Sequence, residues 1–500
     1  MRDLKIGAVV LAILFAGVLL VLAVKWPFTR EATIRSLEQI SLTEVQIPRF
    51  RKVFFLHPGY VAEDVTFRRD HGPGARPLLQ VARITCRASW FSLLSFTHRI
   101  HRIDLEGVQI YIPAPVPPPV RRHPQAKIAT TVTDLYANGT ILEIAPRHPG
   151  GQTIRFEFPE LSASNLARNK PMYFRTLVRN PIPPGDLAVS GTVGPLVLGK
   201  ISDTQISGAF HIRNANLGAY KLISGTLSSD GQFSGKLGRA QVTGRTDIPD
   251  FEVTRSGHPL GLTAEYHAEV NGTTGDVIVQ SALAHFLNTV LTAHGTISGR
   301  PGKTVSLDFG ARQARIQDLL RLFVKADQPP LDGEMTLRAH VVLPPSPAPF
   351  LQRVQLNGDF SITGAAFTNP VTQEKIDDLS ARARAKKHDA KLKQASERVA
   401  AELEGKVILR HEIATLTEAA FAVPGAVAQG SGTYNLASEA VDMRGKLAMR
   451  ASLSQAAGGI KSLLLMPLDP FFRKNGAGAV LPVHMSGTYA HPIFRMSLHQ

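Results

Sequence analysis

The sequence predicts a mainly β protein with a few helices, in which one N-terminal transmembrane helix precedes a long antiparallel β region. Three observations carry this prediction. Residues 6–24 form an unbroken apolar run. The 41 glycines and 34 prolines in 500 residues favour many short elements over long helices. From about residue 187 to residue 310, glycines separate short alternating stretches at a drifting spacing, which is typical of an antiparallel meander rather than of a solenoid.

The apolar run at 6–24 has the length, about 19 residues, that a helix needs to cross the hydrocarbon core of a bilayer. The apolar region of a cleaved signal peptide is usually about 7 to 15 residues long and ends at a small-x-small site, which this run matches poorly. Trp26 suits the interfacial aromatic belt of a retained helix. We therefore expect residues 1–27 to be a signal anchor, and a cleavable signal peptide is the alternative.

Charge does not fix the orientation of this helix, because Arg2 and Lys5 before it are matched by Lys25 and Arg30 after it. The short N-terminal stub and the long C-terminal part favour export of the latter. The bulk of the chain is then expected on the far side of the membrane, tethered by a single pass.

The composition is basic, with 56 Lys and Arg against 40 Asp and Glu, a formal net charge of +16. Such a surface either keeps the protein soluble or favours anionic lipid headgroups and acidic polysaccharides. Nucleic acid is not an expected partner, because no stretch combines a dense basic cluster with RNA-binding aromatic residues or a helix-turn-helix pattern. The single cysteine, Cys86, excludes an intramolecular disulfide and a cysteine-rich metal site, and we interpret it as a buried small side chain.

Residues 28–112 are predicted to form an α/β segment. It starts with a short helix over 29–40, whose apolar face holds Ile34, Leu37 and Ile40. Strand-like pieces follow, among them 61–69 and 101–113. In the second of these, apolar residues occupy both alternating positions, which predicts a strand that is apolar on both faces and needs a cover on each.

Residues 113–124 (PAPVPPPVRRHP) are predicted to be an extended, exposed linker. Residues 125–373 are predicted to form a β-rich body with strands at 141–146, 153–161, 334–344 and 355–370. One helix at 314–326 interrupts it, and we expect this helix to cover a core with a stripe of five apolar side chains: Ile316, Leu319, Leu320, Phe323 and Val324.

Residues 374–404 are strongly charged and rich in alanine, which predicts one long exposed helix that buries little. Residues 405–500 return to a β pattern. Within them, 458–474 has the pattern of a short amphipathic helix broken at Pro467.

No pattern predicts catalysis, a bound metal or a cofactor, so the chain is expected not to be an enzyme. His98 and His101 form an H-x-x-H pair without the glutamate and helical context of a zinc site. Asp247, Asp250 and Glu252 are spaced so that carboxylates on one strand flank a sugar, but turn and strand-edge solvation explains them more simply.

Several segments together resemble the AsmA-like family of membrane-anchored envelope proteins. The resemblance rests on the N-terminal anchor and on structural rather than catalytic motifs, and it covers most of the exported chain: FFLHPGYVAEDVTFRR (54–69), RITCRASWFSLLSFTHRIHRIDLEGVQIYIP (83–113), SGTLSSDGQFSGKLGRAQVTGRTDIPDFEV (224–253), GAAFTNPVTQEKIDDLS (364–380), VPGAVAQGSGTYNL (423–436) and LPVHMSGTYAHPIFRMSL (481–498).

This resemblance implies a single-pass anchor in the bacterial inner membrane and a periplasmic body made of an elongated, curled antiparallel sheet. The family's grooves are proposed to shield the acyl chains of phospholipids in support of the outer membrane. Phospholipid, the inner membrane and other envelope proteins are then the expected partners. As a membrane-proximal apolar patch near the entry of such a groove, we expect four residues: Trp90, Phe91, Leu93 and Leu94.

Two other functions stay open at this point. In the first, the β body is a docking platform for a partner protein, and the anchor only localises this platform at the membrane. In the second the chain acts on a polysaccharide, which requires two carboxyl groups about 5 to 10 Å apart in a cleft. A continuous apolar surface favours the lipid function, whereas a core filled by side chains favours the docking platform.

Overall fold

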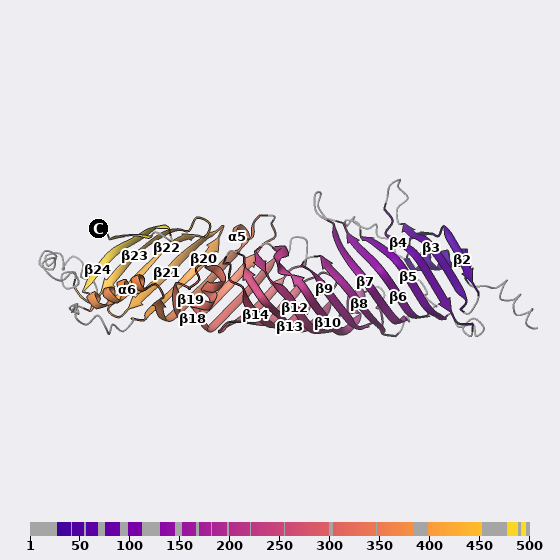
Figure 1. Cartoon of the computed structure of the whole chain (residues 1–500), viewed down its shortest axis with the longest axis horizontal. Helices are drawn as coiled ribbons and strands as arrows, with labels where there is room; N and C mark the ends of the chain where they lie inside the picture. The colour runs from indigo at the N-terminus through magenta and orange to yellow at the C-terminus, as the bar shows by residue number, and fades with distance from the viewer. Residues whose placement is uncertain are drawn as a thin grey trace, which may run out of the picture. The chain divides into compact units, whose positions relative to one another are not determined.

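The computed structural model describes residues 28–41, 43–54, 57–68, 76–90, 99–112, 131–145, 153–166, 170–181, 183–197, 200–220, 222–254, 256–299, 304–346, 348–384, 399–452, 478–488 and 492–496. The chain folds as two compact units, Met1–His211 and Ile212–Gln500. In each unit the strands form a curled, open, mainly antiparallel sheet, to which the helices are added (Figure 1). The predicted mainly β, antiparallel architecture is confirmed at this level.

Among its described residues, the first unit contains one α helix, a 3-10 turn and the strands up to β9, and strand β10 crosses the division between the units. The bounds are α2 (Arg30–Ser41), β1 (Glu44–Gln46), β2 (Arg49–Val53), β3 (Gly59–Arg68), β4 (Leu79–Ala88), β5 (Arg99–Ile112), β6 (Thr131–Ile144), β7 (Ile154–Leu166), β8 (Met172–Pro181), β9 (Pro184–Val193), η1 (Ile201–Asp203) and β10 (Gln205–Asn216). The helix predicted over 29–40 is confirmed as α2.

Strands β5 and β6 are parallel neighbours, whereas the β4–β5 and β6–β7 pairs on either side of them are antiparallel. Parallel neighbours need a crossover connection of about a dozen residues or more. The proline-rich stretch 113–124 lies in this connection, so it joins two adjacent strands of one sheet. Its own structure lies outside the described residues.

The prediction that β5 is apolar on both faces is wrong. At Glu106 and Gly107, where Gly107 has a φ of 61°, the alternation of the strand changes phase. Leu105 therefore lies opposite Ile84, and Val108 lies opposite Val81, with both pairs in one core. Helix α2 adds Ile34 and Leu37 to this core, and Phe28, which precedes the helix, also packs against it.

Among its described residues, the second unit contains three α helices, a 3-10 turn and the remaining strands. The bounds are η2 (Leu217–Tyr220), β11 (Ile223–Ser224), β12 (Thr226–Lys236), β13 (Arg239–Val253), β14 (Leu260–Val270), β15 (Val277–Phe286), β16 (Thr289–Ile297), β17 (Val305–Arg315), α4 (Ile316–Phe323), β18 (Leu331–Leu343), α5 (Phe350–Arg353), β19 (Gln355–Phe367), α6 (Pro370–Ala383), β20 (Ala401–Arg410), β21 (Ile413–Val423), β22 (Ala426–Asn435), β23 (Ala440–Met449), β24 (Ala479–Thr488) and β25 (Pro492–Met496).

Helix α4 confirms the helix predicted within 314–326 but corrects its buried stripe. Ile316, Leu319 and Leu322 are buried, and Leu320 packs against the same core. Phe323, which the periodicity assigned to the buried stripe, is 64% exposed. The helix ends at Phe323, and Val324 is already extended.

The long helix predicted over 374–404 is also corrected. Helix α6 begins earlier, because the side chain of Asn369 caps it by accepting hydrogen bonds from the backbone N–H groups of Val371 and Thr372. It ends at Ala383, and residues 401–404 already belong to strand β20. Residues 385–398 lie outside the described part of the chain.

No helix among the described residues is long and apolar enough to span a bilayer. The anchor predicted at 6–24 lies outside those residues, as does the amphipathic helix predicted at 458–474.

Candidate functional site

The sheet of the second unit has one uncharged face and one charged face. Residues directly opposite each other on adjacent strands share a face, so the strand registers sort the side chains. From β13 to β24 the face that carries Met335 and Leu403 holds apolar or small side chains with a few Thr and Tyr, and none carries a formal charge. We call it the apolar face, and the opposite one the polar face.

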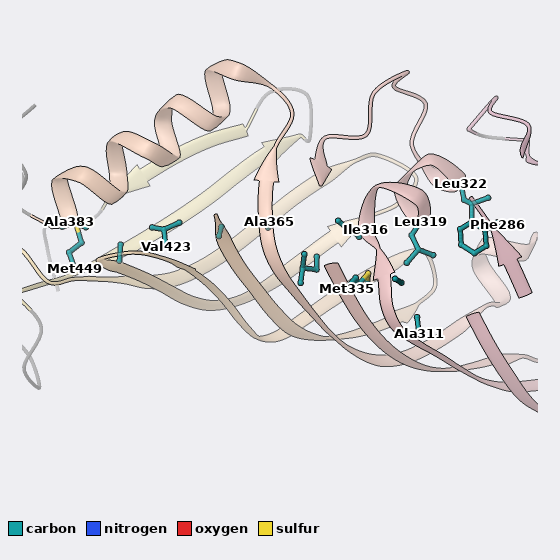
Figure 2. Close-up of a cluster of buried hydrophobic side chains, with 14 of the residues drawn as sticks. Phe286, Ala311, Ile316, Leu319, Leu322, Met335, Ala365, Ala383, Val423 and Met449 are labelled. Atoms are coloured by element: carbon teal, nitrogen blue, oxygen red, sulfur yellow. The ribbon is translucent and has the colours of Figure 1, made fainter. Parts of the chain in front are cut away.

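Helices α4 and α6 cover one edge of the apolar face. Helix α4 packs against β13, β17 and β18, and α6 packs against β19 and β22. Figure 2 shows both helices above the sheet with the apolar side chains beneath them. Strand residues under this cover are buried, and they form one continuous cluster with Leu319 and Ala383 of the helices: Leu260, Phe286, Ala311, Ala314, Met335, Ile362, Ala365, Ala401, Val423, Ala426, Met449, Ala479 and Leu481.

The apolar face continues beyond this buried cluster. One side chain from each of seven successive strands lies opposite the next in register, and each is half-buried. We call these residues the open row: Leu307, Val341, Leu356, Leu409, Ala414, Tyr434 and Val441. Adjacent strands lie about 4.8 Å apart, so the row is about 29 Å long.

A buried carboxylate holds α4 on the sheet. Asp318, 5% exposed, accepts hydrogen bonds from the backbone N–H of Asn288 at 3.0 Å and from the hydroxyl of Thr289 at 2.9 Å. The same hydroxyl accepts a hydrogen bond from the backbone N–H of Arg315 at 3.0 Å. The start of α4 is thereby tied to the β15–β16 turn.

Helix α6 is held by two buried polar side chains. The hydroxyl of Ser380 donates to the carbonyl of Pro424 at 2.7 Å. Gln373 accepts from the backbone N–H of Phe367 at 2.8 Å and donates to the carbonyl of Val399 at 3.1 Å. These bonds connect α6 to the end of β19 and to the β21–β22 turn.

The polar face carries cross-strand ion pairs and hollows. Arg239 pairs with Glu269 at 2.8 Å, and the resulting hydrogen bond holds the pKa of that carboxyl below its ordinary value. A hydrogen bond from His484 to Asp442 at 2.8 Å likewise lowers the pKa of Asp442. Hollows on this face include one over β16–β20 and one over β13–β16. They are lined largely by polar-face side chains.

Of the four residues predicted as a membrane-proximal patch, the structure describes only Trp90, which is half-buried just after β4. Phe91, Leu93 and Leu94 lie outside the described residues, so the patch stays a prediction. The residues of the open row were not singled out in the sequence. The sequence contained one signal for them, the uncharged residues at alternate positions of each strand. Only the strand registers show that these residues form one row.

The other candidates from the sequence have structural roles or remain single side chains. Asp250 accepts hydrogen bonds from the backbone N–H and the hydroxyl of Thr226. His101 is exposed on β5, and His98 lies outside the described residues. Within the described ranges no group of three His, Cys, Asp or Glu side chains is placed to hold a metal ion.

Cys86 is a buried small side chain, as predicted, in the core of the first unit. Burial raises the pKa of its thiol to about 12, so the thiol is protonated at neutral pH. The chemistry of a nucleophilic thiolate therefore does not apply to it.

Comparison with protein-family models, with curated proteins and with solved structures finds no match to this chain.

Proposed function

We propose that this chain is a membrane-anchored, non-enzymatic protein of the bacterial envelope that binds or conducts phospholipid along its apolar face. The observation that supports this proposal best is the open row, an uncharged strip of half-buried side chains that continues beyond the cover of α4 and α6. In this proposal residues 6–24 hold the chain in the inner membrane, and the two units lie in the periplasm and support outer-membrane homeostasis.

The dimensions and energetics of the open row suit an acyl chain. An acyl chain spans one leaflet of the hydrocarbon core, which is about 15 Å thick. The open row, about 29 Å long, is longer than that. Each methylene that leaves water for an apolar surface gains about 0.8 kcal/mol. Contact with the row therefore holds an acyl chain without any catalytic residue.

A docking platform for a partner protein is the second candidate function. The specific observation in its favour is that the side chains of α4 and α6 already fill the apolar face at one edge, as an ordinary core does. In this alternative an apolar segment of a partner covers the open row instead of a lipid.

A photocrosslinking experiment separates the two functions. The photoreactive amino acid p-benzoylphenylalanine replaces Leu356 of the open row in the full-length chain, in cells. The matched control places it at Gln355, the preceding residue of β19, which is exposed on the polar face and lies outside the lining of the hollow over β16–β20. After irradiation the purified protein is digested and its peptides are analysed by mass spectrometry.

We expect phospholipid adducts at position 356 and none at position 355. Protein adducts at position 356 without lipid adducts would favour the docking platform. Equal lipid labelling at both positions would contradict the proposal, because labelling would then report the nearby membrane rather than the apolar face.

A further inference from the structure

A hollow of about 1160 Å³ lies on the polar face of the second unit, over strands β16 to β20. Its lining includes Arg312, Arg338, His294, His340 and Asp308. These residues come from three adjacent strands: His294 from β16, Asp308 and Arg312 from β17, and Arg338 and His340 from β18. The strand register alone brings them together.

Gly310 leaves the floor of this hollow without a side chain. It lies opposite Thr292 on one side and Arg338 on the other. A Cβ atom at Gly310 would come within 2.9 Å of the Thr292 hydroxyl oxygen and within 4 Å of no other atom outside its chain neighbours. Close backbone packing therefore does not require glycine here, and what this glycine provides is open space in the floor of the hollow, next to Arg338.

The two arginines of the hollow differ from others on the same face. Arg239 and Arg444 each have a carboxylate within 4 Å. Among the described residues, neither Arg312 nor Arg338 has a carboxylate within that distance. Both are exposed, so their guanidinium donors face the hollow and solvent.

The other charged groups of the hollow are largely engaged with one another. Asp308 accepts a hydrogen bond from Nδ1 of His340 at 2.7 Å, and Nε2 of His294 lies 3.8 Å from its other oxygen. Lys406 pairs with Glu418 at 2.7 Å. Asp359 lies between Arg338 and Lys406 in the register. Among the described side chains that line the hollow, Arg312 and Arg338 are thus the cations without a carboxylate within 4 Å.

We propose that this hollow is a binding site for a phosphoryl group, held between Arg312 and Arg338. A guanidinium group presents its donors in a planar fork that matches two phosphate oxygens, and such charge-assisted pairs are among the stronger hydrogen bonds in proteins. The site lies on the face opposite the open row, so it does not depend on the proposed acyl-chain function. The phosphoryl group belongs either to a small phosphate ester or to a phospholipid headgroup.

The test uses the full-length chain in nonionic detergent micelles and isothermal titration calorimetry. Two ligands are titrated separately: inorganic phosphate and dihexanoylphosphatidylglycerol. The hollow variant carries Arg312→Gln and Arg338→Gln. The matched control carries Arg239→Gln and Arg444→Gln, which remove the same charge from the same face outside the hollow. Gly310→Leu fills the hollow and leaves the charge unchanged. Circular dichroism verifies that each variant is folded.

We expect the hollow variant and Gly310→Leu to weaken binding at least tenfold and the control to weaken it less than twofold. If inorganic phosphate shows this pattern, the phosphoryl group alone is sufficient for binding. If only the lipid shows it, the site binds a phospholipid headgroup. Equal losses in the hollow variant and the control would overturn the proposal, because binding would then follow net charge. Absence of binding of both ligands to the unmodified chain would overturn it as well.

Discussion

At the residue scale, Asp318 is a buried carboxylate that joins helix α4 to the sheet. Its carboxylate satisfies two donors, the backbone N–H of Asn288 and the hydroxyl of Thr289, at a buried position. A donor left unsatisfied in a buried site costs about 1 to 3 kcal/mol. The carboxylate also lies in the first turn of α4, where a negative charge is favourable.

Replacing Asp318 with alanine should therefore lower the free energy of unfolding of the full-length chain by about 1 to 3 kcal/mol. Replacement with asparagine should cost less, since its amide oxygen still accepts a hydrogen bond. Denaturant titration followed by fluorescence measures both values. A change below about 0.5 kcal/mol in the alanine variant, the usual range of surface substitutions, would show that the bonds do not hold α4 on the sheet.

At the scale of the element, facing glycines let strands β22 and β23 approach closely on the apolar face. Gly430 and Gly445 lie opposite each other. A Cβ atom at Gly430 would lie 2.3 Å from the carbonyl oxygen of Arg444, and one at Gly445 would lie 2.4 Å from that of Gln429. Both contacts involve backbone atoms, which cannot rotate away as a flexible side chain does.

The substitution Gly430→Val is expected to destabilise the chain by about 1 to 3 kcal/mol, the usual cost of overpacking. The control is Gly261→Val in β14, where the nearest atom to a new Cβ, the carbonyl oxygen of Pro249, is 4.0 Å away. Valine favours strands, so this control should be neutral or slightly stabilising. Thermal unfolding compares the two variants. Equal effects would show that the close approach of β22 and β23 does not require glycine at position 430.

Strand and helix positions followed largely from composition and periodicity, but the facing of individual side chains did not. The helix within 314–326 was predictable from its repeat. The choice between the adjacent Leu322 and Phe323 for burial depends on how the helix meets β17 and β18, which no local pattern contains. In β5 the sequence pattern predicts two apolar faces, but the change of phase at Gly107 places these apolar side chains on a single face.

The candidate sites depended even more on register than the elements did. The open row takes one residue from each of seven strands, and the polar-face hollow joins His294, Asp308 and His340. Sequence separation between these residues gives no local signal. Alternation of uncharged and charged residues predicted that a strand has two unlike faces, but only the pairing of strands shows which side chains become neighbours.

At the scale of the whole molecule, the two units have separate hydrophobic cores. The buried residues of the first core lie between Val45 and Val108, whereas those of the second core lie between Leu260 and Leu481, and the two sets share no residue. In the sheet of each unit a strand packs mainly on its neighbours, and in such quasi-linear arrays a local loss of contacts acts chiefly on the adjoining elements.

Truncating a core residue in one unit should consequently loosen that unit and leave the other protected. Met335→Ala removes a buried side chain of β18, at an expected cost of about 2 to 5 kcal/mol, and Val65→Ala makes the reciprocal change in β3. Hydrogen exchange measured by mass spectrometry should show faster exchange in β17–β19 for the first variant and in β3–β5 for the second. Uniformly faster exchange along the chain in either variant would instead mean that both cores open in one cooperative step, because local openings leave distant amides protected.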